Sequence, residues 1–510
     1  MSTATTKSKA GVAQPTGLSR DESEALGGKA RKRVSPASHG SWEPSADRPN
    51  PIEVLEEQGR SRVPELVPLR YGRMLVSPFT FYRGAAAIMA ADLGAVPDTG
   101  LRAQLCGDAH LSNFGAFASP ERRLMFDIND LDETLPGPWE WDVKRLVASL
   151  AVAGRSNGHT VAERESMLLA AAGAYRAAMG EFATMGTLEV WYSSLSVDEL
   201  RAEVRQRVTA RQERAKAKGK TKGKSKGKAN GKGKANGTGD QNAARLALAE
   251  KNMAKARTKD HEGTFKKLTR VVDGRVRIIS DPPVIVPVDE LMTDPSQVGR
   301  FKEVMDEFMA DYAATLAPDR RHLFNQYRFV DFARKVVGVG SVGTRAWIML
   351  MQGVNGKPLF LQLKEAQASV LEPYAGRGEY SHNGERVVSG QRMMQAHGDI
   401  FLGWHKTNGV DGVERDYYVR QLKDWKGSAL VDEMGPGALT IYAEVCARTL
   451  ARAHARSGDR IAIASYLGDD DTFDRAMAQF SEAYADQNER DYKTLLGAVE
   501  SGRIEAQTGV

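Results

Sequence analysis

The sequence predicts an α+β protein in two parts, a helical part and a strand-rich part. Apolar residues recur with helical spacing near 139–153 and 161–184, and again near 438–457 and 471–500. Between these segments lie short apolar runs bounded by Gly or Asn-Gly turns, a pattern that favours antiparallel strands. The runs are 332–337, 344–351, 359–364 and 416–422. A chain of 510 residues is long enough to bury both parts.

Composition divides the chain further. The first 50 residues are rich in Ser, Pro, Lys and Ala without a periodic apolar pattern, so we expect disorder there. We expect the following organisation: 1–50 disordered, 51–210 a helical lobe, 211–240 a flexible Lys/Gly-rich insertion, 241–330 a helical connection, 331–430 a strand-rich lobe, and 431–510 C-terminal helices that complete the helical lobe.

The formal net charge of +6 comes from one segment. Residues 215–239 contain nine lysines and no acid, and without them the net charge is −3. Like-charged, low-complexity segments are commonly solvated linkers, which is the interpretation we favour. A weak contact with nucleic acid phosphates is the alternative. The basic composition therefore does not identify the ligand of the folded part.

Other global features predict a cytoplasmic protein that does not enter a membrane. The two cysteines cannot form a disulfide framework. The N-terminus has no apolar signal sequence, and no apolar run approaches the roughly 18 residues that span a bilayer.

Residues 104–133 form an acidic segment built from two short apolar strands and their loops. Asp108 follows the first strand, Asn113 lies five residues later, and Asp127 ends the second strand, with Asp130 just beyond it. Divalent cations such as Mg²⁺ prefer oxygen ligands of this kind, usually one or two carboxylates together with substrate phosphates. Asp108 is then available to accept a proton. The alternative is a set of solvated acids and helix caps.

A second candidate site is the glycine-rich segment 338–344. Gly338, Gly340 and Gly343 fit the pattern G-x-G-x-x-G, with Ser341 among them. A dinucleotide fingerprint requires a helix directly afterwards, whereas this segment is followed by a predicted strand, turn and strand carrying Lys364. Backbone amides of such a loop can bind phosphate oxygens. An ordinary glycine turn beside an exposed lysine is the alternative.

Together these segments resemble the protein-kinase-like superfamily, and the acidic segment is closest to its aminoglycoside and choline kinase branch. The resemblance implies that Asp108 is the catalytic base, that Asn113 and Asp127 bind metal, and that Asp142 braces the catalytic loop. Cys106 replaces the His of the branch motif H-G-D, and His110 is the candidate to take over the role of that His.

The same resemblance implies that the glycine loop and Lys364 hold the triphosphate of ATP. Glu372 and Glu385 are both candidates for the glutamate that pairs with this lysine. In kinases the glycine loop precedes the catalytic loop, whereas here it follows, so a circularly permuted two-lobed fold is expected.

Over about residues 50–505 the sequence also resembles family 2252 of the domains of unknown function. The segments that carry this resemblance include SPFTFYRGAAAIMAADL, QLCGDAHLSNFGAFASPERRLMFDINDLDETLPGPWEWDVKRL, KVVGVGSVGTRAWIMLMQG and DYYVRQLKDWKGS.

The function expected from these observations is ATP- and Mg²⁺-dependent transfer of a phosphoryl group to an acceptor that the sequence does not identify. Two alternatives stay open: a metal-dependent phosphohydrolase, and a non-catalytic protein that binds nucleotide or nucleic acid. Arg70, Arg73 and Arg83 precede the acidic segment, and Arg83 is a candidate for contact with a phosphate or an acidic substrate, although arginines also pair with structural carboxylates.

Overall fold

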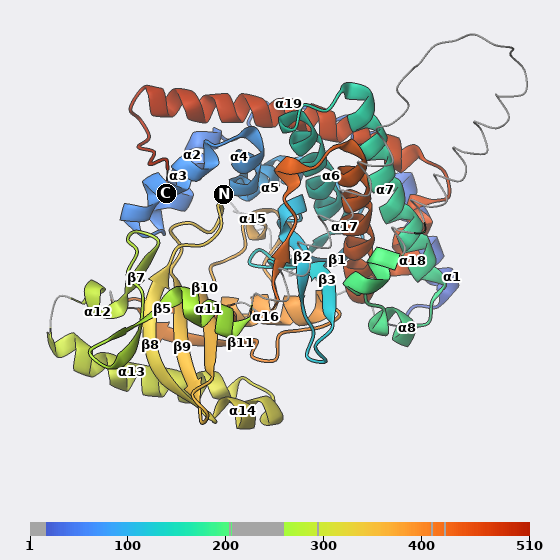
Figure 1. Ribbon diagram of the computed structural model, residues 1–510. Coiled ribbons are helices and arrows are strands. Elements are labelled where there is room, and N and C mark those ends of the chain that lie inside the picture. Colours follow the sequence, from blue (N-terminus) through green and yellow to red (C-terminus); the bar gives the residue numbers. More distant parts are fainter. Residues whose placement is uncertain are drawn as a thin grey trace, which may run out of the picture.

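The computed structural model describes residues 17–202, 206, 260–292, 295–409, 412–422 and 425–509, without the side chains of 295–300 and 302. Helices and antiparallel sheets are both extensive, which confirms the α+β prediction (Figure 1). The expected flexible insertion, 211–240, lies outside the described residues.

The largest sheet has six antiparallel strands in the order β11-β12-β10-β9-β8-β7. Their bounds are β7 (Ile285–Pro287), β8 (Tyr327–Lys335), β9 (Ala346–Gly353), β10 (Pro358–Glu365), β11 (Gly403–Asn408) and β12 (Glu414–Gln421). The four strands predicted from apolar runs are therefore present, with ends shifted by up to five residues. Two helices, α13 (Pro295–Ala314) and α14 (Pro318–Phe324), cover one face of this sheet (Figure 1).

Alternation along β10 separates an apolar face from a polar one. Leu359, Leu361 and Leu363 are buried in the core shared with α13, while Gln362 and Lys364 line a cavity on the other side. This division follows from the two-residue period of a strand, which sends successive side chains to opposite faces.

The helical part is built from segments at both ends of the chain. The helices α6 (Trp139–Ser156), α7 (Val161–Thr184), α17 (Pro436–Ser457) and α19 (Thr472–Glu500) pack on one another, as Figure 1 shows. Trp139 is fully buried at the start of α6, where its ring stacks on that of Tyr175 from α7. The four helices predicted from periodicity are present.

The N-terminal region departs from the prediction of disorder. Residues 20–33 form α1 (Arg20–Arg33), and a short 3-10 helix follows at Pro36–Gly40. Ser19 and Glu22 form a capping box at the start of α1, and the helix packs on α18 (Arg460–Leu467). Small buried residues such as Gly27 allow close approach to the backbone of α18, so little apolar surface is needed.

The structure divides two further regions into shorter elements. The segment 79–93 lies in two helices, α4 (Pro78–Gly84) and α5 (Ala86–Gly94), which follow α2 (Pro51–Arg60) and α3 (Val67–Met74). The described part of the connection 241–330 contains the helices α11 (His261–Leu268) and α12 (Val288–Leu291), and also a hairpin of β5 (Thr269–Val272) and β6 (Arg275–Ile278).

Small strands lie between the large sheet and the helices. The strand β1 (Arg102–Leu105) pairs with β4 (Leu135–Pro138), while β2 (Phe114–Ala118) pairs with β3 (Leu124–Ile128) and with β13 (Gly427–Ser428). Further helices are α8 (Thr187–Tyr192), α15 (Glu372–Ala375) and α16 (Asn383–Met394). The loops that leave β1 and β3 carry the acidic segment.

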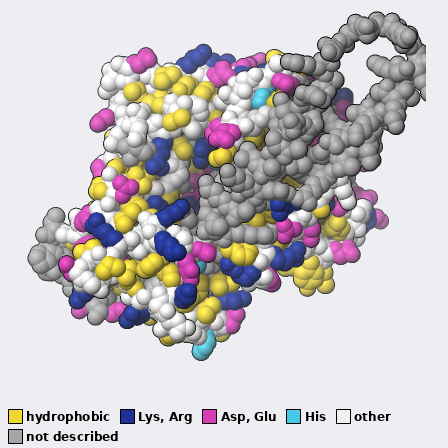
Figure 2. All heavy atoms as spheres, viewed as in Figure 1, with side chains coloured by type: hydrophobic (Ala, Val, Ile, Leu, Met, Phe, Trp, Pro, Cys, Tyr) yellow, Lys and Arg dark blue, Asp and Glu magenta, His cyan; other side chains and the backbone are white. Residues whose placement is uncertain are grey.

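The surface carries mixed charge on the face drawn in Figure 2, where basic and acidic side chains are interspersed. Within the described ranges, none of the helices combines the length and the apolar character that crossing a bilayer requires.

Candidate functional site

A polar cavity of about 420 Å³ lies between the six-stranded sheet and the loop 106–113. Its lining comes from three distant stretches of sequence: the acidic segment, the glycine-rich loop, and the polar face of β10 with the end of β12. The lining includes Asp108, Asn113, Asp130, Gly338, Gly340, Ser341, Gln362, Lys364, Arg420 and Lys426. The structure therefore brings together most of the site residues that the sequence predicted.

The loop 106–113 is fixed by a buried carboxylate. Asp142, in the first turn of α6, accepts hydrogen bonds from the backbone amides of Cys106 (2.6 Å) and Gly107 (3.0 Å). Behind it, His454 Nε2 lies 3.2 Å from Asp142 Oδ2, and the hydroxyl of Tyr175 lies 2.8 Å from His454 Nδ1. This confirms the predicted bracing role of Asp142 and adds two residues that the sequence did not connect with it.

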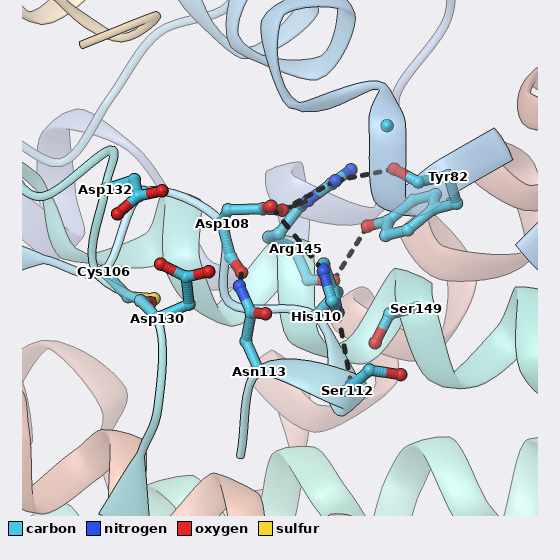
Figure 3. Close-up of polar contacts among 12 residues, drawn as sticks. Tyr82, Cys106, Asp108, His110, Ser112, Asn113, Asp130, Asp132, Arg145 and Ser149 are labelled. Carbon is cyan, nitrogen blue, oxygen red and sulfur yellow. Dashed lines mark hydrogen bonds and ion pairs between the residues drawn. The ribbon is translucent and has the colours of Figure 1, made fainter. Parts of the chain in front are cut away.

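Asp108 projects from this loop and is paired with Arg145 (Figure 3). The guanidinium Nε donates to Asp108 Oδ1 over 2.9 Å, and His110 Nε2 lies 3.6 Å from the other carboxylate oxygen. Burial raises the pKa of Asp108, and the positive charge of Arg145 opposes that rise. Arg145 was missed in the sequence, although it lies one helical turn after Asp142 and so on the same face of α6.

Asn113 and Asp130 lie next to Asp108 (Figure 3). Asn113 Nδ2 donates to the carbonyl of Asp108 over 2.7 Å, and the backbone amide of Asn129 donates to the carbonyl of Asn113 over 2.7 Å. These hydrogen bonds connect the loop 106–113 to the loop after β3. Although burial opposes it, the positive charges of Lys364 and Arg420 lower the pKa of Asp130, which keeps it ionised.

Lys364 is buried, and it pairs with two aspartates of the loop after β3. Its ammonium lies 3.3 Å from Asp130 Oδ1 and also contacts Asp132, whose other oxygen accepts from the hydroxyl of Tyr418. Burial opposes the shift, but the two carboxylates raise the pKa of Lys364.

Neither glutamate considered from the sequence is the partner of Lys364. Within the described residues this lysine forms ion pairs with Asp130 and Asp132 alone, so Glu372 and Glu385 are both replaced in that role. The reason is tertiary, since the loop after β3 approaches the polar face of β10 more closely than α15 or α16 does.

Asp127 is separated from this group, contrary to the interpretation that made it a metal ligand. It is 1% exposed on β3, and its Oδ1 accepts from the guanidinium of Arg452 on α17 and from the amide of Ile128 (2.9 Å). Its Oδ2 accepts from the amide of Ala396 over 3.1 Å. The carboxylate is thus committed to holding β3 against its neighbours, whereas Asp130, three residues further on, lines the cavity together with Asp108.

The glycine-rich loop joins β8 to β9, and glycine is required at several of its positions. Gly338 and Gly343 have φ values of +69° and +88°, which side-chain-bearing residues rarely adopt. A Cβ on Gly340 would lie 3.1 Å from the carbonyl of Arg83. Gly338, Gly340 and Ser341 line the cavity, whereas Gly343 packs beside Arg62 outside it.

The cavity also has a basic wall that sequence reasoning missed. Arg420 donates to the carbonyl of Asn129 over 2.9 Å, and it lies beside Lys426. The charge of Arg420, together with burial, lowers the pKa of Lys426 to about 7. Alternation along β12 was the available signal, because Gln362 and Lys364 of β10 stand in register with Arg420 and Tyr418.

Few of the described side chains in this cavity are of the kind that ligates a cation. In the described part of the chain no three His, Cys, Asp or Glu side chains converge as a metal cage. Asp130 and the side-chain oxygen of Asn113 offer a smaller oxygen donor set, which fits a Mg²⁺ ion that completes its coordination with substrate oxygens and water.

Fold and site together define an α+β protein with a polar cavity of mixed charge between an antiparallel sheet and a helical part. The chain belongs to the family described as "Uncharacterized protein conserved in bacteria (DUF2252)", which matches residues 62–241 and 234–498. Neither the curated proteins nor the solved structures include a match to this chain.

Proposed function

We propose that this protein transfers the terminal phosphoryl group of ATP to a hydroxyl-bearing acceptor, with Mg²⁺, in a two-lobed kinase-like fold of circularly permuted order. One observation carries the proposal. Two segments that separately resemble kinase motifs, the acidic loop with Asp108 and the glycine loop with Lys364, line the same cavity.

The order of elements supports the permuted arrangement. The order expected in the strand-rich lobe of a kinase is also found here: β8, the glycine loop, β9, β10 with Lys364, then α16, β11 and β12. The catalytic-loop candidate precedes this series, and α17 to α19 follow it and pack with α6 and α7. The helical lobe is thereby completed from both ends of the chain.

Asp108 is the residue assigned to the acceptor. Its carboxylate orients the hydroxyl and takes the proton while that oxygen forms a bond to the γ-phosphorus; the bond from this phosphorus to the β–γ bridging oxygen breaks, and ADP leaves. Arg145 holds the carboxylate in place at 2.9 Å, and Asp142 holds the loop that carries it.

The triphosphate is assigned to the glycine loop and to the basic side chains. Amides near Gly338 and Gly340 can approach phosphate oxygens because no side chain intervenes. Lys364, Arg420 and Lys426 supply positive charge in the same cavity. Asn113 and Asp130 are the residues that would hold Mg²⁺, which supplies charge neutralisation of the phosphates when bound.

The test is ATP binding by calorimetry with and without Mg²⁺, followed by turnover, on wild type and three variants. Asp130→Asn and Lys364→Met should abolish Mg²⁺-dependent binding. Asp127→Asn is the matched control, because its carboxylate contacts Arg452 and not the cavity. It should keep ATP binding and lose only stability.

Two results would contradict the proposal. Absence of ATP binding in wild type would remove the nucleotide assignment. Cleavage of phosphate esters that needs metal but is indifferent to Lys364→Met would instead favour a phosphohydrolase that uses the same acids.

A further inference from the structure

A second cavity, of about 230 Å³, opens from the same centre and has a different lining. It shares Asp108, Asn113, Asp130 and Arg83 with the first cavity. Arg62 and Arg70 line only this second cavity, whereas Lys364, Arg420 and Lys426 line only the first. The site therefore has two basic regions, one on each of two cavities that meet at Asp108.

Among the described residues, the three arginines of the second cavity form no ion pair with a carboxylate. Arg70 is 1% exposed; its Nη2 donates to Gln58 Oε1 (2.7 Å) and to the carbonyl of Gly84 (3.2 Å), while Nε and Nη1 have no partner. Arg62 is 9% exposed, with its Nη1 on the carbonyl of Val342 and its Nε unpartnered.

Arg83 completes the group from the end of α4. Its Nε is buried without a hydrogen-bond partner. Across the described ranges none of the three guanidinium groups forms an ion pair with a carboxylate. Burial of positive charge without a counter-ion is unfavourable, and it is seldom retained unless an anion is bound there.

The acids that line the same cavity are already engaged. Asp108 pairs with Arg145, Asp130 with Lys364, and Glu365 with Arg345. Glu133 accepts from the amide of Val370 over 2.8 Å, and burial raises its pKa to about 7, so its negative charge is weakened at neutral pH. Nearby carboxylates, Glu133 and Glu365 for Arg62 and Asp108 for Arg83, act on these arginines without forming ion pairs, so guanidinium donors are left for a ligand.

We propose that Arg62, Arg70 and Arg83 bind a phosphate group carried by the acceptor, so that the acceptor is a small phosphorylated molecule whose free hydroxyl faces Asp108. This rests on the proposed function, which supplies the reaction at Asp108. Guanidinium groups offer several parallel donors and suit phosphate oxygens better than a single point charge does. The cavity volume fits a phosphate and a few further heavy atoms.

The experiment measures binding of inorganic phosphate to the full chain by calorimetry. Arg62→Gln and Arg83→Gln should weaken phosphate binding at least tenfold. Arg60→Gln is the matched control, since this arginine lies two residues away, is exposed, and pairs with Glu57; it should leave phosphate binding unchanged. Circular dichroism of each variant checks folding. Because Arg83 is less buried than Arg62, Arg83→Gln provides a second test if Arg62→Gln fails to fold.

The variant Lys364→Met distinguishes phosphate binding in the first cavity from phosphate binding in the second. Phosphate binding that survives Arg62→Gln and Arg83→Gln but is lost in Lys364→Met would place phosphate in the first cavity and overturn the inference, as would no phosphate binding by wild type. Mg²⁺–ATP binding is measured on the same proteins, and the control Arg60→Gln should retain it. Arginine-dependent phosphate binding without any ATP binding would refute the proposed nucleotide function while supporting the arginine site.

Discussion

The two loops that meet at the cavity are held in opposite ways. The loop 106–113 is fixed by buried charge, with Asp142 accepting two backbone amides and Arg145 holding Asp108. The glycine-rich loop is held mainly through its own carbonyl groups: Gly338 accepts from Arg73 over 2.8 Å and Val342 from Arg62. Within the described part of the chain the amides of Gly338 and Gly340 have no hydrogen-bond partner, which leaves them for a ligand.

The two loops therefore differ in how far their geometry is fixed before a ligand binds. The acidic loop has its reacting carboxylate positioned before any ligand arrives, which limits the reorganisation needed during a reaction. The glycine loop is anchored at one end by the buried Val342, and its described contacts include no buried carboxylate that fixes Gly338 and Gly340, so we expect the geometry at these two glycines to depend on what the loop binds. The predictions below test this contrast, beginning with the largest expected effect.

Asp142→Ala should have the largest effect. It removes both hydrogen bonds to the loop and leaves buried amides unpaired, which should lower the free energy of unfolding by about 3 kcal/mol and abolish turnover. Urea denaturation measures the first and an ATP turnover assay the second. Asp319→Ala is the control, because Asp319 also lies in the first turn of a helix but is exposed, and it should change stability little. A loss as small as that of the control would show that the loop is not anchored by Asp142.

The basic wall should make nucleotide binding depend on pH. Lys426 has a pKa of about 7, so it is charged below that pH and neutral above it. A bound phosphate would raise this pKa, and linkage then requires affinity to fall as pH rises, by about tenfold from pH 6 to pH 8. Calorimetry at both pH values measures the change, and Lys426→Met should flatten it. An equal pH dependence in that variant would assign the effect to the nucleotide itself.

Gly338→Ala should reduce stability by about 1 kcal/mol, because φ is +69° and a left-handed conformation is unfavourable for alanine. Space is not the limit, since the nearest atom to the added Cβ is 3.8 Å away. Gly497→Ala in α19 is the control and should be neutral or stabilising. Denaturation of both variants checks the sign. Equal changes in the unfolding free energy of the two variants would contradict the explanation from the left-handed backbone conformation.

Tyr175→Phe should have the smallest effect. It removes one hydrogen bond to His454, which should lower the unfolding free energy by about 0.5–1 kcal/mol and slow turnover a few-fold by loosening Asp142. Steady-state kinetics at fixed ATP measures the change. Loss of stability with turnover intact would restrict this chain of contacts to a structural role.

Several elements were predictable because their signal is local. The helices α6, α7, α17 and α19 follow from periodicity, and four strands of the large sheet follow from short apolar runs between turns. The helix α1 was not predictable in this way, since it is stabilised by close packing on α18 rather than by a broad apolar face.

The sequence by itself determined four of the helices, four strands of the large sheet, the acidic loop with Asp108, Asn113 and Asp130, and the glycines whose backbone angles exclude other residues. These features depend on neighbours in the chain. Only the tertiary structure decided that Asp127 faces Arg452, that Lys364 pairs with Asp130 and Asp132, and that Arg62 lies beside the site. The physical reason is that the role of a charged side chain depends on the groups nearest to it in space, and those groups come from distant parts of the chain.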